Sequence, residues 1–274
     1  MNNTLYTLSN MGAYTNITKP LSRSYAAYAW EFLRRNPDYR AAFERSRSAK
    51  IDPRKSANGG CLFKTKNRSL AAEKWGLQYF ANPGLDYLSA PVFWTKEAFP
   101  GALPVEIEPT NSKNLTEKCI QFSDILCVRQ HLITANGERQ SVLKSPYFWL
   151  QFFGSPDKPT HEKGRVIIRV DGSAGMRKRL NILQFLADLR DGKEPLTASN
   201  QGLQTFENLR FYGGILDLKA RGHSYREIST VLLGQERTQA EWETGGCSLK
   251  SKIVRGLARG RALSRSGYRD LLKK

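Results

Sequence analysis

The chain has 274 residues and is strongly basic, with 43 Lys and Arg against 25 Asp and Glu and a hydrophobic fraction of 40%. This length and composition can bury a sizeable core in one large or two ordinary domains, and a net charge of +18 favours a polyanionic partner. No apolar run approaches the ~20 residues of a membrane-spanning helix, and the N-terminus lacks the regions of a signal peptide. We therefore expect a cytoplasmic protein with no membrane partner.

Residues 1–20 are polar and aperiodic, and we expect them to form a mobile tail. Two helices are predicted next, over 24–35 and 37–46. The break between them is predicted at Asn36, a good N-cap, because the following proline suits the first helical position. Trp30 lies near this break, and we expect it to anchor the two helices in preference to stacking on a base.

A basic connector follows from Arg45 to Arg68, where eight Lys and Arg face a single acid. This pattern fits either an arm that tracks a DNA backbone or a solvated linker, and the sequence favours neither. A further helix is predicted from Ser69 to Phe80, and Asn82-Pro83-Gly84 signals a turn after it. Several prolines then mark a looped boundary near residues 100–112.

The middle of the chain has the patterning of β-structure. Two candidate strands, Ile120–Ile133 and Gln140–Leu143, flank Asn136-Gly137, which is the strongest short signal for a hairpin. Two more strands are predicted over Phe148–Phe153 and Arg165–Val170. After these strands the pattern becomes helical.

Helices are predicted over Met176–Asp191 and Phe206–Ala220, and a helix-turn-helix pattern follows the second one. Gly222 suits the left-handed residue that ends a helix. Ser224 and Glu227 have the spacing of a capping box, which begins the next helix. A tight αα-hairpin in any helical domain would give the same pattern, so this stretch alone leaves both readings open.

The helix predicted from Ser248 to Leu263 separates apolar residues from positive charge. Its apolar residues recur every four positions: Leu249, Ile253 and Leu257. At about 100° per residue, the roughly opposite face carries a polar and cationic ridge formed by Ser248, Lys252, Arg255 and Arg259. Residues 248–274 hold nine Lys and Arg and one acid, whereas residues 201–247 hold five Lys and Arg and six acids. Such concentration on one element is what a phosphate-contacting helix requires.

These patterns together predict an α+β chain. A helical N-terminal module with the basic connector is expected over 21–110, and a small β-hairpin or sheet region over 111–172. An all-helical domain with the helix-turn-helix is expected over 173–274.

Two blocks of the chain resemble a known family of regulators. In the C-terminal block the motifs are Gly222, Ser224-Tyr-Arg-Glu-Ile228, Leu232-Leu-Gly234, Trp242, Ser248-Leu249-Lys250 and Ser266-Gly-Tyr-Arg-Asp-Leu-Leu272. In the N-terminal block they are Ala29-Trp-Glu-Phe-Leu-Arg-Arg-Asn-Pro-Asp-Tyr39, Trp75-Gly-Leu77 and Pro91-Val-Phe-Trp94. These blocks resemble a transcriptional-regulator module and a helix-turn-helix variant domain. Both occur in proteobacterial regulators of integrative and conjugative elements.

The resemblance implies a DNA-binding transcriptional activator of genes for element excision and transfer. It also implies an alternative, because copies of the C-terminal domain alone can act as antiactivators that bind proteins. In that case the domain would dock onto RNA polymerase or a regulatory protein instead of reading double-stranded DNA.

The residues expected to contact DNA come from two helices. Lys252, Arg255 and Arg259 would face the major groove, where Arg and Lys recognise guanine edges and phosphates. Arg226, near the start of its helix, would contact a phosphate with help from the helix dipole. Ser248 and Lys250 complete the predicted set, although Lys250 lies nearer the apolar seam.

Other kinds of site are not expected. The four cysteines and three histidines lack the close spacing of metal ligands. The acids form no convincing catalytic cluster, and no glycine-rich phosphate loop with its Lys-Ser/Thr ending is present. The sequence thus predicts a protein that is not an enzyme and needs no cofactor.

Overall fold

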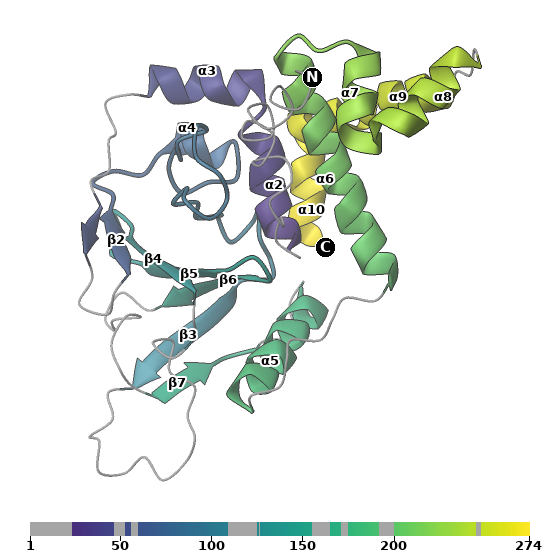
Figure 1. The fold of residues 1–274 in the computed structure, drawn as a ribbon. Coiled ribbons are helices and arrows are strands. Elements are labelled where there is room, and N and C mark those ends of the chain that lie inside the picture. Colours follow the sequence, from purple (N-terminus) through teal and green to yellow (C-terminus); the bar gives the residue numbers. More distant parts are fainter. Residues whose placement is uncertain are drawn as a thin grey trace. The chain divides into compact units, whose positions relative to one another are not determined.

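The computed structural model describes residues 24–46, 53–55, 60–108, 125, 127–154, 165–170, 175–191, 200–244 and 248–274. The tail expected over residues 1–20 lies outside this part of the chain. The described residues form two compact units (Figure 1). Unit 1 holds residues 200–244 and 248–263, and unit 2 holds the described residues from 24 to 191 together with 264–274. None of the described helices is long and apolar enough to cross a membrane.

Unit 2 begins with the two expected helices, α2 (Tyr25–Leu33) and α3 (Pro37–Arg45). The side chain of Asn36 ends one and begins the other as predicted, because its Oδ1 accepts hydrogen bonds from the amides of Asp38 and Tyr39 at 2.8 and 3.2 Å. Trp30 is fully buried, its ring meets that of Tyr39 edge to face at 5.8 Å, and its Nε1 donates to the carbonyl of Leu85. Trp30 is therefore an anchor and cannot stack on a base.

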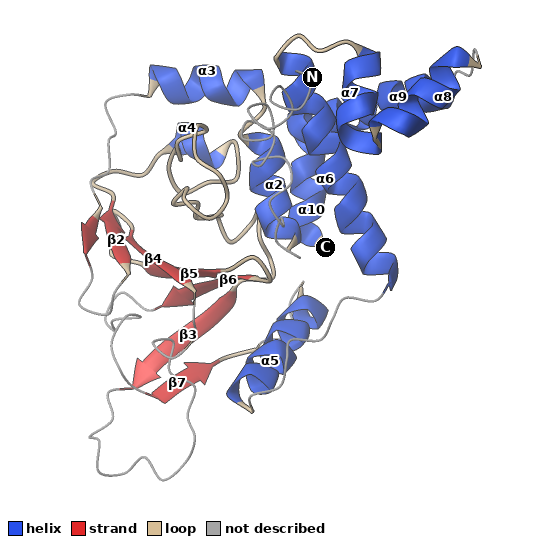
Figure 2. Ribbon diagram, viewed as in Figure 1, coloured by secondary structure: helices blue, strands red, loops and turns tan. Residues whose placement is uncertain are grey.

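The sheet of unit 2 has the strand order β1-β2-β4-β5-β6-β3-β7 (Figure 2). The strands are β1 (Arg54–Lys55), β2 (Cys61–Lys64), β3 (Leu103–Glu108), β4 (Val128–Ile133), β5 (Arg139–Lys144), β6 (Trp149–Gly154) and β7 (Arg165–Ile168). The pairs β2–β4 and β3–β6 are parallel, and the remaining neighbours are antiparallel. The expected mixture of helices and strands is thus confirmed.

The hairpin between β4 and β5 forms as predicted around Asn136-Gly137. The amide of Thr134 donates to the carbonyl of Glu138 at 2.9 Å, and Gly137 adopts a φ of 83°, which glycine accepts without strain.

Two parts of this sheet were not expected. Residues 103–108 were predicted as part of a looped boundary, but they form β3, which pairs with β6 on one side and β7 on the other. The prolines around this segment hid its alternation, in which Leu103 and Val105 are buried. Strands β1 and β2 lie in the basic connector. One sheet therefore contains residues from both sides of position 110, where the sequence predicted the boundary between the N-terminal module and the β region.

The helix predicted over Ser69–Phe80 is wrong beyond its first turn. Only α4 (Leu70–Glu73) is helical, and the chain then turns at Gly76, whose φ is 79°. A Cβ at Gly76 would lie 2.8 Å from the Cβ of Ala98, so a close backbone approach as well as a left-handed turn breaks the helix here.

Helix α5 (Met176–Arg190) forms where the sequence predicted it and covers the sheet. Its buried residue Leu186 packs on a cluster of strand residues: Leu103, Val105, Leu143, Leu150 and Phe152.

The C-terminal helix α10 (Tyr268–Lys273) lies beside α2 within unit 2, and a π-helical turn, Leu263–Gly267, precedes it. Tyr268 is fully buried, donates from its hydroxyl to the carbonyl of Trp75 at 3.2 Å and stacks on Trp94. Tyr268, Leu271 and Leu272 are all buried and complete the core of the unit that contains the N-terminal helices, a contact that sequence spacing does not encode.

Unit 1 consists of four helices: α6 (Asn200–Ala220), α7 (Tyr225–Leu233), α8 (Gln235–Glu243) and α9 (Ser248–Ala262). Its core is formed by Ile215, Leu218, Ile228, Ile253 and Leu257.

Candidate nucleic-acid interface

The turn between α6 and α7 is fixed at both of its ends. The amide of His223 donates to the carbonyl of Leu218 and that of Gly222 to Lys219, which is the Schellman arrangement, and Gly222 has a φ of 89°. The amide of Ser224 then donates to the Glu227 carboxylate at 2.7 Å, and the amide of Glu227 donates to the Ser224 hydroxyl at 3.3 Å. The predicted capping box is confirmed, and it sets where α7 begins.

Helix α8 was not predicted, because it has no apolar stripe to reveal it. Its buried residue is Thr238, whose hydroxyl lies 3.0 Å from that of Ser229 on α7. Gly234 joins the two helices with a φ of 98°. In a helix-turn-helix, α8 would take the place of the helix after the turn, but it carries three glutamates and one arginine, and this net negative charge disfavours an approach to phosphates.

Helix α9 lies very close to α6 through a face that contains glycine. A Cβ at Gly256 would lie 2.5 Å from Cδ1 of Ile215, and a Cβ at Gly260 would lie 3.0 Å from Cγ of Leu216. Ile253 and Leu257 are buried on this side as predicted. The close approach fixes the rotation of α9, so the opposite side of the helix is held toward solvent.

The exposed side of α9 combines cations with small residues and has no acid. Arg255 and Arg259 are exposed, and neither forms an ion pair with any residue that the structure describes. The other exposed positions between Ser251 and Ala262 are Val254, Ala258, Lys252 and Arg261. Small side chains beside arginines let a helix come close to base edges, where methyl groups can contact thymine. These small residues can be read from the sequence, but the prediction of a DNA-contacting face used only the charges.

Lys250 and Lys252 are exposed as well, but they face different surroundings. The ammonium of Lys252 lies 5.4 Å from the centre of the Phe211 ring on α6, a cation–π contact that directs it along the helix surface. Lys250 stands on the other side of the apolar seam, away from the ridge defined by Arg255 and Arg259.

Ser248 and Arg226, the two DNA contacts predicted at helix starts, each lie near a carboxylate of the protein itself. Ser248 hydrogen-bonds to the Glu241 carboxylate, which also accepts from the amide of Leu249 at 2.7 Å, and these bonds lower the pKa of Glu241. Arg226 is exposed, but Glu227 beside it holds a charged carboxylate at the start of α7, where the hydrogen bonds with Ser224 lower its pKa. Negative charge at both helix starts weakens them as phosphate sites.

Two aromatic side chains near α9 are partly buried in unit 1. Tyr225 packs against the core of unit 1 and lies under the Lys219 ammonium at 4.9 Å from its ring centre. Trp242 is half-buried on α8. The geometry therefore gives unit 1 a rigid helix with an exposed cationic face, suited to a polyanion.

Comparison with known families agrees with this chemistry. Residues 170–273 match the family described as "T6SS, Transcription factor, DNA binding domain", and residues 16–80 match the "Proteobacterial transcriptional regulator-like domain". No curated protein matches the chain. The two descriptions indicate a transcription factor with a DNA-binding domain, which confirms the expected resemblance at this level and supports DNA as a partner.

Proposed function

We propose that the protein is a transcription regulator that reads double-stranded DNA through the exposed face of α9. Arg255 and Arg259 are the central contacts, and Lys252 extends the same ridge along the helix. The observation that carries the proposal is the composition of this face, where cations stand among small side chains without any acid on the helix. An exposed helix with no role in binding would usually mix both signs of charge.

The remaining predicted residues have smaller parts in this proposal. Arg226 is an exposed cation on the flank and contacts a phosphate, whereas Lys250 lies across the apolar seam from the ridge and is a weaker candidate than the sequence implied. Ser248 orders the start of α9 through Glu241 and is a weaker candidate for a DNA contact than the sequence implied.

Our proposal for the genes that this protein controls rests on resemblance alone. The family resemblance noted in the sequence favours an activator of excision and transfer genes in mobile elements. The description of the matched DNA-binding family names T6SS, which adds secretion genes as a second target class. Regulator domains at both matched regions favour a protein without catalytic activity, acting in the cytoplasm where bacterial DNA lies.

The experiment is selection of bound duplexes from a random DNA pool, with two double variants of α9 compared with the parent chain. Arg255→Gln with Arg259→Gln removes two charges from the ridge. Lys250→Gln with Arg261→Gln removes the same charge from the same helix away from the ridge and is the matched control. Lys252 is kept because its contact with Phe211 supports the fold.

An enriched motif that the ridge variant fails to recover, and the control variant does recover, supports specific reading by α9. Salt dependence gives an independent measure, because each lost phosphate contact reduces the slope of log K against log salt by ~0.9. Equal weakening by both variants with no enriched motif would contradict the proposal. A binding partner found among RNA polymerase subunits, with little salt dependence, would favour the docking alternative.

A further inference from the structure

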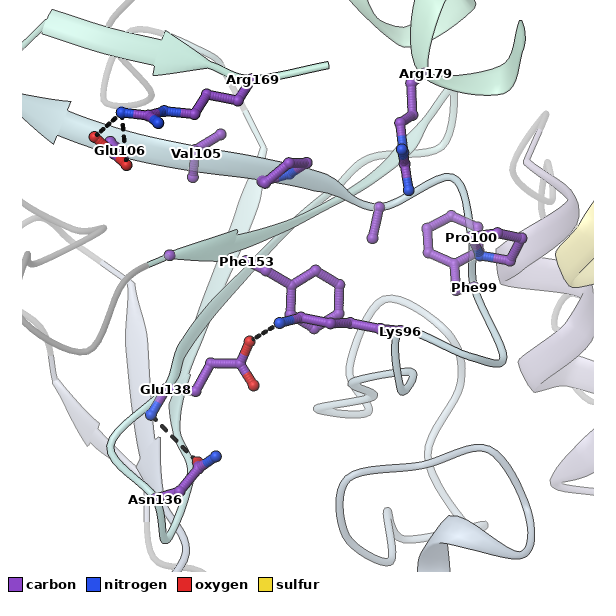
Figure 3. Close-up of a pocket in the computed structure, with 13 residues that line it drawn as sticks. Lys96, Phe99, Pro100, Val105, Glu106, Asn136, Glu138, Phe153, Arg169 and Arg179 are labelled. Carbon is purple, nitrogen blue, oxygen red and sulfur yellow. Dashed lines mark hydrogen bonds and ion pairs between the residues drawn. The ribbon is translucent and has the colours of Figure 1, made fainter. Parts of the chain in front are cut away.

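A cavity beside the sheet of unit 2 has charged residues in its walls, but its carboxylates are already paired (Figure 3). The cavity has a volume of about 570 Å³. Its Glu106 carboxylate lies 3.2 Å from the Arg169 guanidinium, and Glu138 pairs with Lys96. The two ridge arginines of α9, in contrast, form no ion pair with any residue that the structure describes. The face of α9 is therefore the stronger candidate for an anionic partner.

Val254 is an exposed aliphatic residue on this face of α9. It is 42% exposed, whereas the other large aliphatic residues of the helix, Leu249, Ile253 and Leu257, are each at most 5% exposed. The core of unit 1 forms without Val254. Valine is also a poorer helix former than alanine, because its branched side chain loses χ1 freedom in a helix. Neither packing nor helix stability therefore accounts for a valine at this position.

Only short side chains separate Val254 from the ridge. At about 100° per residue, Ala258 lies about 40° and Ser251 about 60° around the helix from Val254. Arg255 lies about 100° away in the same direction, whereas the buried Ile253 lies about 100° away in the other direction. Val254, Ser251, Ala258 and Arg255 are all exposed. The methyl groups of the valine are thus accessible beside the arginines.

The chemistry of the major groove provides a matching group for an exposed aliphatic side chain. Base pairs present hydrogen-bond donors and acceptors there, and thymine adds its apolar 5-methyl group. A valine placed against a donor or acceptor would leave that polar group without a partner, which costs binding free energy. Arginine instead recognises the acceptors of guanine. Val254 and the ridge arginines therefore suit different bases.

We propose that Val254 is a specificity-determining residue that contacts the 5-methyl group of a thymine, next to the bases that Arg255 and Arg259 contact. This role of Val254 rests on the proposed function of α9 and adds the identity of one base that the helix selects. Ala258 permits the contact, because its side chain is too short to hold α9 away from the base pairs. A valine that is exposed without such a role would leave binding indifferent to the methyl group.

The test uses the duplex that the full chain enriches from the random DNA pool. Each thymine of that duplex is replaced singly by uracil, which lacks the 5-methyl group and keeps the hydrogen-bonding groups. Fluorescence anisotropy then gives the dissociation constant of each duplex with the parent chain and with two variants. Val254→Ala removes the valine methyl groups and should fold, because alanine is a better helix former at an exposed position. Val231→Ala makes the same change on α7, where the valine is 37% exposed, and is the matched control.

Uracil at one position should weaken binding of the parent chain about fourfold, the equivalent of the ~0.8 kcal/mol for burial of one methyl-sized group. The same replacement should weaken binding of the Val254→Ala variant much less, because the two changes remove the two sides of one contact. The Val231→Ala variant should retain the full loss.

Two results would overturn this role of Val254 while leaving the proposed function intact. One is a parent chain that binds every uracil duplex as tightly as the original. The other is a loss on uracil replacement that is equal for the parent chain and the Val254→Ala variant. If instead no duplex is enriched, or the ridge variant recovers the same duplex as the parent chain, α9 does not read DNA and both proposals fail.

Discussion

Replacing Gly256 by alanine tests the close packing of α9 on α6. The added Cβ would lie 2.5 Å from Cδ1 of Ile215 and 3.3 Å from Cε1 of Phe211, against an ordinary carbon contact of ~3.5–4.0 Å. Ile215 is fully buried, so its methyl group has no open space to enter. Overpacking of this kind costs ~1–3 kcal/mol. Alanine in a helix interior returns ~0.8–1.0 kcal/mol relative to glycine. We therefore expect a net loss of up to about 2 kcal/mol.

Hydrogen exchange of amides in α6 and α9 measures this loss, because it reports the stability of unit 1 by itself. Gly213→Ala in α6 is the matched control, since a Cβ there would meet nothing within 4 Å, and it should stabilise the unit by ~0.5–1 kcal/mol.

A double variant locates the cause of the loss. Ile215→Val removes the clashing Cδ1 and alone costs ~0.5–1.5 kcal/mol. In combination with Gly256→Ala, it should be less destabilising than the sum of the two single changes by about 1 kcal/mol. The reasoning is refuted if Gly256→Ala stabilises the unit as Gly213→Ala does, or if the two changes are simply additive.

Three further predictions concern the ends and the core of the units. Ser224→Ala should destabilise α7 by ~1 kcal/mol, because the Glu227 amide loses its cap, and faster exchange of that amide would show it. Burial lowers the pKa of Lys144 to about 7, so above that pH the folded chain holds it neutral while the unfolded chain stays protonated up to about pH 10.5. The free energy of unfolding should therefore rise with pH across this window by up to ~1.4 kcal/mol per unit and level off below it, and Lys144→Met should abolish this rise in urea titrations. Tyr268→Ala should destabilise unit 2 by ~3 kcal/mol, seen as faster exchange in α2, whereas the exposed Tyr147→Ala should have no effect.

Features set by neighbouring residues were predictable from the sequence. The capping box at Ser224, the turn at Gly222 and the Asn36 cap need only partners within a few positions, and each formed as expected. The exposure of Arg255 and Arg259 also followed from helical periodicity.

Features that depend on distant partners were missed. Strand β3 is extended because it pairs with β6, about fifty residues away in the sequence, whereas the prolines in and around it predicted a loop. Helix α8 buries almost nothing, so no apolar period marked it. At the candidate site, the hydrogen bond of Ser248 with Glu241 joins the start of α9 to α8, a contact that neither helix pattern reveals.

The membership of α10 in unit 2 affects the order in which the chain folds. The ribosome makes the 65 residues from Ser199 to Leu263 before it makes the segment that covers α2. At ~5–20 residues per second this delay is roughly 3–13 s. During that time the N-terminal unit carries an uncovered apolar surface while the helices of unit 1 emerge. A product that stops before Ser264 retains the α9 arginines but leaves the α2 surface open to proteases.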